Sequence, residues 1–137
     1  MKLIRDASVA LPMWLPEQHT DACLALREDV LGGVHELLAP DTLPIEVAHA
    51  LTRAERQGRI NQGQNRALFD GFLEICPTLN PYFENLDRAM QLSSAFRIGV
   101  FDCCYVALAE EQDCRVVTLD QRFLELFPDQ TVSLQAL

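Results

Sequence analysis

The chain has 137 residues, of which 49% are hydrophobic and 23% are charged, values typical of one globular domain. They exclude a disordered tail, a collagen-like repeat and a disulfide-rich miniprotein. Twenty acidic residues against eleven basic ones give a formal net charge of −9. Because binding to phosphates depends on clustered Lys and Arg, such a chain can bind nucleic acid only through local basic patches or bound cations.

Hydropathy and cysteine usage indicate a cytoplasmic protein without membrane contact. No apolar run approaches the ~20 residues that cross a bilayer, and the charged Asp6 follows too soon for the apolar core of a signal peptide. The cysteines are odd in number and lack C-x-x-C spacing, which predicts buried thiols in place of a disulfide framework. They are Cys23, Cys76, Cys103, Cys104 and Cys114.

Short apolar strands alternate with helices along the chain. Strands are predicted at residues 2–5, 36–39, 78–80, 115–118 and 131–134. Helices are predicted at residues 8–14, 17–30, 42–58, 61–75, 84–98, 102–109 and 120–127. This alternation predicts a single domain over residues 1–137, an α/β/α sandwich of three layers with a mostly parallel sheet of about five strands.

Four acidic residues stand where this architecture would bring them together. Asp6 and Asp120 follow predicted strands, Asp102 opens a helix, and Glu46 lies in the first turns of another. In a parallel sheet the functional site lies beyond the carboxyl ends of the strands. Carboxylates gathered there repel one another unless cations or protons compensate, and Mg²⁺ or Mn²⁺ prefers such oxygen ligands.

A structural role for the same acids is the competing interpretation. Asp41 and Asp120 have the position of helix caps, where a negative charge favours the helix dipole. Asp102 and Glu46 lie among apolar neighbours, where an unpaired acid is costly. Asp6, directly after a strand, is the hardest to explain as a cap. Spacing alone leaves both interpretations open.

Four segments, in order, resemble the motifs of the PIN-domain family. The first is Asp6-Ala7-Ser8-Val9-Ala10-Leu11, with Trp14 and Pro16-Glu17 behind it. The second joins Leu38-Ala39-Pro40-Asp41 to the segment 46–51, and the third is the segment 101–109. The fourth is Val117-Thr118-Leu119-Asp120-Gln121-Arg122-Phe123. The match spans nearly the whole chain, and its length resembles that of the VapC-type toxins within the family.

The resemblance implies an Mg²⁺- or Mn²⁺-dependent endoribonuclease, usually dimeric, that is encoded beside a protein inhibitor, the antitoxin. Carried over position by position, Asp6, Glu46, Asp102 and Asp120 would form the acidic metal site. Ser8 and Thr118 match polar positions that support the first and fourth acids. Metal-activated water would then attack the phosphodiester without a side-chain nucleophile.

Three positions depart from the family pattern, one of them Pro12, which interrupts the first predicted helix. Arg5 stands where these proteins usually carry an apolar strand residue, which indicates a side chain facing an edge or the surface. His49 stands where the family often has Asn, one turn after Glu46. We expect His49 to pack or form a hydrogen bond and not to bind the metal.

A basic stretch contains Arg53, Arg56, Arg59 and Arg66. Either it is a solvated helix face with acidic partners such as Glu55, or its first three arginines contact RNA and guide it to the acidic pocket.

Apolar residues on the early helices and in the segment 84–98 exceed what one sheet layer can cover, which predicts a two-fold homodimer. The expected partners are RNA, a second copy and an antitoxin that directs an Arg at the acids. A PIN-like nuclease of RNA processing and an inactive interaction module remain as alternative functions.

Overall fold

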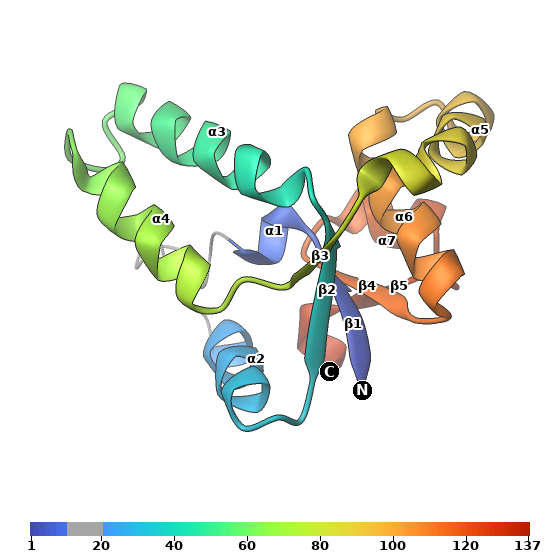
Figure 1. Ribbon diagram of the computed structural model, residues 1–137, viewed down its shortest axis with the longest axis horizontal. Helices are drawn as coiled ribbons and strands as arrows, with labels where there is room; N and C mark the ends of the chain where they lie inside the picture. The colour runs from blue at the N-terminus through green and yellow to red at the C-terminus, as the bar shows by residue number, and fades with distance from the viewer. Residues whose placement is uncertain (11–20) are drawn as a thin grey trace.

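The computed structural model describes residues 1–10 and 21–137 and contains five strands in its central sheet. They are β1 (Lys2–Arg5), β2 (Glu36–Pro40), β3 (Thr78–Asn80), β4 (Arg115–Thr118) and β5 (Thr131–Ser133). The strands are all parallel and lie in the order β3-β2-β1-β4-β5 (Figure 1). The predicted five-stranded parallel sheet is confirmed.

The helices lie near their predicted places. They are α1 (Ala7–Ala10), α2 (Asp21–Leu31), α3 (Leu43–Arg56), α4 (Gln64–Glu74), α5 (Leu86–Phe96), α6 (Val100–Gln112) and α7 (Gln121–Leu126). The predicted helix over 84–98 is a 3₁₀ turn, η2 (Tyr82–Asn85), followed by α5, and a second 3₁₀ turn, η3 (Leu134–Ala136), closes the chain. The predictions for Pro12, Trp14, Pro16 and Glu17 lie outside the described residues.

Two hydrophobic layers cover the faces of the sheet. Successive side chains of a strand point to opposite faces, so Leu3 packs in a cluster with Leu26 of α2, while Ile4 packs in a larger one with residues of α3 and α6. Leu37 and Leu38 of β2 divide between the same clusters. The predicted α/β/α sandwich is therefore confirmed.

Helix α6 is the central helix of the larger layer. Its residues Cys103–Ala109 are all buried, so it is apolar around its circumference, and the cysteines are free thiols. Among the described residues no single helix is long and apolar enough to cross a membrane. Only the consecutive pair Tyr82–Phe96 and Val100–Gln112, bent by 119° to each other, reaches that length and composition together.

The prediction that Arg5 faces an edge or the surface is wrong. Strand β1 is central, paired with both β2 and β4, and Arg5 is fully buried. Its guanidinium carbon lies 5.4 Å from the ring centre of Phe72. Burial lowers the pKa of Arg5 to about 10, although Cys76, Tyr105 and Asp6 favour its charge. The position of a strand within its sheet depends on pairing between distant segments. The sequence around Arg5 therefore does not show that its strand is central and its side chain buried.

The strand order places a topological switch point between β1 and β4. The chain leaves β1 for β2 and β3 on one side, and then returns to β4 on the other side. In open parallel sheets the ligand crevice lies outside the carboxyl ends of the strands at such a point. In Figure 1 strands β1 and β2 run upward towards the space between two arms, one of α3 and α4 and the other of α5 and α6.

Candidate active site

Asp6 stands at the switch point, where a network of hydroxyl groups holds its carboxylate. Arg5 pairs with Val117, so Asp6, which directly follows β1, lies beside Thr118, the last residue of β4. The Oδ1 atom of Asp6 accepts hydrogen bonds from the Ser8 backbone N at 3.0 Å and from Ser8 Oγ at 2.6 Å. Its Oδ2 atom accepts one from Thr118 Oγ1 at 2.6 Å. These bonds orient both carboxylate oxygens.

The two hydroxyls are themselves fixed by the backbone after β4. Ser8 Oγ accepts a hydrogen bond from the Leu119 N–H, and Thr118 Oγ1 accepts one from the Asp120 N–H, both at 3.0 Å. Each hydroxyl therefore accepts from a backbone group and directs its own proton to Asp6. Despite these bonds, burial raises the pKa of Asp6 to about 6. The ionised carboxylate is thus costly at neutral pH.

Glu46 is held in the first turn of α3 by a residue that sequence reasoning missed. Its Oε2 atom accepts hydrogen bonds from Tyr105 Oη at 2.6 Å and from Thr42 Oγ1 at 3.1 Å. Burial raises the pKa of Glu46, and the negative charges of Asp102 and Asp6 add to that rise. Tyr105 follows Asp102 by one turn in an apolar helix, and a buried Tyr hydroxyl needs a partner. This need for a hydrogen-bond partner is the sequence signal that could have identified Tyr105.

Asp102 lies in the first turn of α6, near Asp120 at the start of α7. Burial raises the pKa of Asp102, the charge of Asp120 raises it further, and Arg122 lowers it. Asp120 caps α7, because its Oδ1 accepts hydrogen bonds from the backbone N–H groups of Arg122 and Phe123 at 2.9 and 3.3 Å. These capping bonds use only one oxygen, so capping leaves Oδ2 available to a ligand.

Asp41, by contrast, does not cap α3 as predicted. The residue at that cap position is Thr42, and Asp41 Oδ1 instead accepts a hydrogen bond from the Tyr82 backbone N at 2.9 Å. Asp41 therefore ties the end of β2 to η2 and takes no part in the acidic site.

The four predicted acids lie along the carboxyl edge of the sheet, and neighbouring acids repel one another electrostatically. Glu46 is acted on by the charges of Asp6 and Asp102, and Asp102 by that of Asp120. They do not form a tight cluster: among the described residues no three His, Cys, Asp or Glu side chains are grouped closely enough to hold a metal ion. The structure thus brings the acids to one edge as neighbours and leaves them spread along it.

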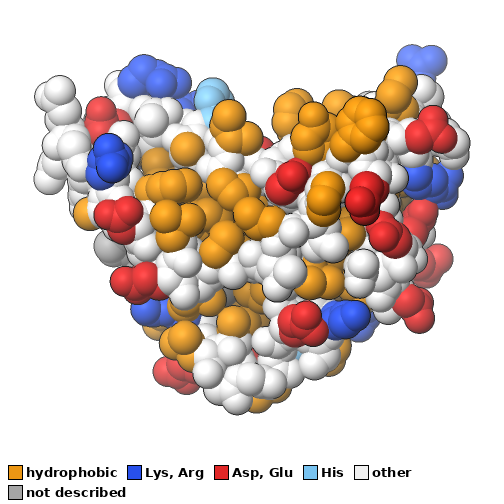
Figure 2. Space-filling model, in the orientation of Figure 1, with side chains coloured by type: hydrophobic (Ala, Val, Ile, Leu, Met, Phe, Trp, Pro, Cys, Tyr) orange, Lys and Arg blue, Asp and Glu red, His pale blue; other side chains and the backbone are white. Residues whose placement is uncertain are grey.

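Two pockets adjoin this line of acids. The larger, of about 490 Å³, is lined by Ala7, Ile45, Glu46, His49 and Phe101. The smaller, of about 80 Å³, contains Asp102, Asp120 and Arg122. Figure 2 shows a hollow between the two arms, with hydrophobic side chains on its walls and acidic side chains beside them.

A comparison with known families decides the classification of this fold and site. The sequence profile of the PIN domain matches residues 3–126. The chain belongs to the PIN-domain family. All four acids and both supporting hydroxyls of this PIN domain fall within the matched region.

Curated relatives of this PIN domain cover nearly its whole length. It is 30% identical over 130 residues to "Ribonuclease VapC3" of Pyrobaculum aerophilum, an alignment that covers 93% of this chain and 96% of the relative. It is 25% identical over 120 residues to "VapC ribonuclease Mb0985" of Mycobacterium bovis, covering 88% of this chain and 87% of the relative.

Solved structures share the fold of this PIN domain at lower identity. PAE2754 from Pyrobaculum aerophilum superposes with a TM-score of 0.71 at 20% identity, covering 98% of this chain and 93% of that one. VapBC2 from Rickettsia felis, solved bound to a DNA fragment from its promoter, also gives 0.71, at 13% identity, covering 97% and 98%. At these identities the likeness is one of fold.

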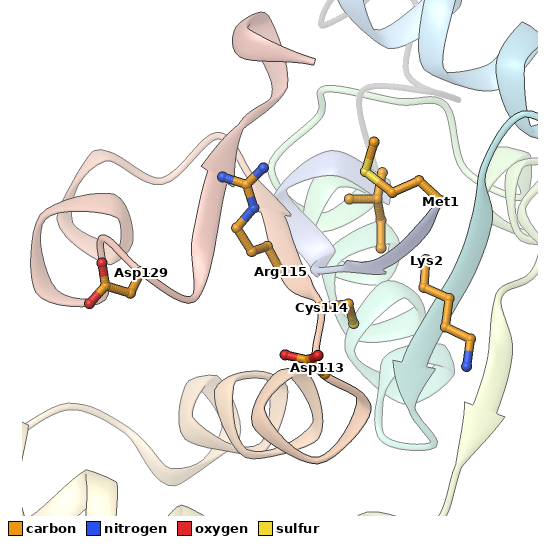
Figure 3. A pocket seen from close by; sticks show the side chains of 7 residues that line it. Met1, Lys2, Asp113, Cys114, Arg115 and Asp129 are labelled. Carbon is orange, nitrogen blue, oxygen red and sulfur yellow. The ribbon is translucent and has the colours of Figure 1, made fainter.

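A further pocket of this PIN domain lies at the opposite, amino edge of the sheet (Figure 3). It measures about 440 Å³, and its lining includes Lys2 and Arg115 as well as Asp113 and Asp129. All four are exposed. Pocket volume therefore does not distinguish the two edges. Among the described residues that line these pockets, the acids that accept hydrogen bonds from hydroxyl groups and repel one another lie at the carboxyl edge.

The predicted basic residues lie along and just beyond α3. Arg53 and Arg56 are exposed in its last turns, and Arg59 is exposed after its end. Glu55, the expected acidic partner, accepts a hydrogen bond from the Gly63 N–H at 3.1 Å. Within the described residues neither Arg53 nor Arg56 forms an ion pair with a carboxylate. Among the described residues, Arg53 and Arg56 therefore lack the ion pairs expected for a solvated face.

Proposed function

We propose that this PIN domain is an Mg²⁺- or Mn²⁺-dependent endoribonuclease and the toxin of a toxin–antitoxin pair. The observation that carries the proposal is the line of carboxylates Asp6, Glu46, Asp102 and Asp120 at the switch point. The proposal accords with the relatives that carry the name VapC ribonuclease.

In ligand type, although not in close grouping, the four acids fit a hard divalent cation. All four groups are carboxylates, and the pKa values of Asp6, Glu46 and Asp102 are raised by burial and, for Glu46 and Asp102, by neighbouring negative charge. A cation would relieve both costs at once, and Mg²⁺ or Mn²⁺ is the hard ion that oxygen ligands favour. When bound, it would supply activation of water and stabilisation of charge on the phosphate.

The residues of the chain itself would prepare the site. Ser8 and Thr118 hold Asp6 in its ionised form with both oxygens oriented. Tyr105 fixes Glu46, and burial raises the pKa of the Tyr105 phenol well above its usual range, so it remains a donor at every physiological pH. In this proposal the acids hold the cation and position water, and no side chain of the site acts as a nucleophile.

The proposal includes two protein partners. Exposed Met90 and Phe96 on α5 support a homodimer, since exposed apolar side chains gain from burial between subunits. The acids support an antitoxin whose Arg side chain enters the site, since a guanidinium bonds two carboxylate oxygens at once.

The test is hydrolysis of single-stranded RNA by the purified protein with Mn²⁺, with Mg²⁺ and with chelator. We expect activity only with divalent metal. Asp6→Ala, Glu46→Ala, Asp102→Ala and Asp120→Ala should each reduce kcat/KM by about 100-fold or more, non-additively, because the acids act as a unit. Asp113→Ala and Asp129→Ala, at the opposite edge, are the matched controls and should keep wild-type activity.

Full activity of Asp102→Ala would contradict the proposed site. Activity that persists in chelator would contradict the metal dependence. An RNA-degrading protein with no inhibitor encoded by a neighbouring gene would favour the role in RNA processing over that of a toxin.

A further inference from the structure

The larger pocket at the carboxyl edge has an apolar wall next to a proposed metal ligand. Glu46 lies in this pocket together with Ile45 and Phe101, which are 69% and 56% exposed. Ala7, adjacent to Asp6, lines the same space. A volume of about 490 Å³ is within the range of pockets that hold small organic groups, ~300–1,000 Å³. An exposed phenylalanine beside an acidic site indicates a ligand that is partly aromatic or apolar.

A stripe of exposed residues leads away from that wall along α3, apolar at its start and basic at its end. Its exposed residues are Ile45, His49, Arg53 and Arg56, spaced at helical intervals on the face opposite the buried Leu43, Val47, Leu51 and Ala54. The stripe is about 16 Å long at 1.5 Å per residue. Figure 2 shows it as basic and His side chains over α3 that lead to the hydrophobic hollow. The ligand therefore has an apolar part at the pocket and negative charges along the helix.

We propose that this pocket receives an unpaired base of the RNA substrate, stacked on Phe101, while phosphates of the same strand follow Arg53 and Arg56. The inference rests on the proposed ribonuclease function and deepens it, because it gives Phe101 a substrate-binding role that the resemblance to the family did not imply. A peptide would also fit an apolar pocket, but the basic stripe complements a polyanion.

The charge of the protein gives this arrangement its physical reason. A chain of net charge −9 repels RNA at long range, so its affinity for the strand cannot come from its overall field. Stacking of a base on an aromatic ring does not depend on net charge and contributes about 1–3 kcal/mol per base. Phe101 directly precedes Asp102, so a stacked base would place its phosphodiester next to the acids.

The experiment compares Phe101→Leu with Phe101→Trp, and uses Phe83→Leu as the matched control. Phe83 is 74% exposed on η2 and does not line the pocket. Binding is measured by the fluorescence of a short single-stranded RNA that carries 2-aminopurine. The binding buffer contains Ca²⁺ in place of Mg²⁺, because Ca²⁺ also takes oxygen ligands but with looser geometry. Hydrolysis of the same RNA is measured in Mn²⁺.

Phe101→Leu should raise Kd and KM about 5- to 150-fold, the loss expected for one stack, with kcat little changed. It should also lose the 2-aminopurine quenching, whereas Phe101→Trp and Phe83→Leu should keep wild-type values. An abasic phosphodiester chain of equal length should bind wild type and Phe101→Leu equally. Arg53→Gln and Arg56→Gln should each lower the slope of log Kd against log salt by about 0.7, and the exposed Arg97→Gln should not.

Equal Kd and KM for Phe101→Leu and Phe83→Leu in an active enzyme would overturn the stacking inference and leave the proposed function intact. A wild-type protein that neither binds nor hydrolyses RNA would overturn both. If Phe101→Leu changes only inhibition by the protein from the neighbouring gene, the pocket serves that partner and the inference is wrong.

Discussion

The two edges of the sheet carry pockets of about 490 and 440 Å³, yet their charged groups differ in kind. At the carboxyl edge Asp6 is partly buried and both of its oxygens accept hydrogen bonds from hydroxyl groups. At the amino edge Asp113 and Asp129 are exposed and share their pocket with Lys2 and Arg115. The carboxyl edge places the partly buried Asp6 and Glu46 beside the exposed Asp102 and Asp120, whereas the amino edge mixes exposed charges of both signs.

This difference identifies the functional edge better than pocket size does. An exposed charge near an opposite charge contributes little to stability in either direction. A carboxylate whose pKa is raised to about 6 by burial costs free energy at neutral pH, and that cost accords with a role in binding a cation. Three measurements compare the edges directly.

The largest effect is expected from Asp6→Asn in metal-free buffer. The pKa of Asp6 is about 6 in the folded protein against 3.8 as its ordinary value, so stability falls as pH rises from about 4 through 6. The ionised carboxylate then costs about 3 kcal/mol above pH 7. Asp6→Asn should raise Tm by several °C at pH 8, at roughly 3 °C per kcal/mol, and this gain should vanish towards pH 4.

Asp113→Asn at the amino edge is the control for this pH series. Its free energy of unfolding should stay within about 0.5 kcal/mol of that of wild type at every pH, as for other exposed substitutions. A gain for Asp6→Asn that does not depend on pH would show that the buried charge is not its source.

Mn²⁺ should have the next largest effect. A ligand that binds only the folded state stabilises it by RT ln(1 + [L]/Kd), or about 1.4 to 2.7 kcal/mol between ten and a hundred times Kd. Thermal unfolding with millimolar Mn²⁺ should show this gain for wild type and for Asp113→Asn, and lose it for Asp6→Asn and Asp102→Asn. A gain that survives in Asp6→Asn and disappears in Asp113→Asn would place the cation at the wrong edge.

The smallest effect compares two buried threonines at opposite ends of neighbouring strands. Thr118 donates to the Asp6 carboxylate, and Thr131 donates to the backbone oxygen of Phe127 at 2.7 Å. A hydrogen bond to a charged group contributes about 1.5–3 kcal/mol and a neutral one about 0.5–1.5. In urea unfolding at pH 8, Thr118→Val should therefore lower the free energy of unfolding by about 1 kcal/mol more than Thr131→Val does. At pH 4 the two substitutions should lower it by similar amounts. Equal losses at both pH values would mean that Asp6 is not held as an ion.

The local elements of this protein follow from its sequence alone. Apolar strands of four or five residues, capping positions and the acids that follow strands depend on neighbours in the chain, so their types and approximate places were predictable. Residues 115–118 form β4 as predicted, and Asp120 caps the helix that follows. The family motifs added an assignment of the four acids to one metal site, which remains a prediction.

Which of these elements contact one another depends on how the whole chain packs. Arg5 is buried because β1 lies between β2 and β4, and Tyr105 reaches Glu46 across 59 residues of sequence. The pocket between Ile45 and Phe101 likewise joins α3 to α6. Periodicity reports which side of an element is apolar, but not which other element covers it. Strand order and helix packing are set by the burial of the whole core, so contacts between distant residues appear only once the chain has folded.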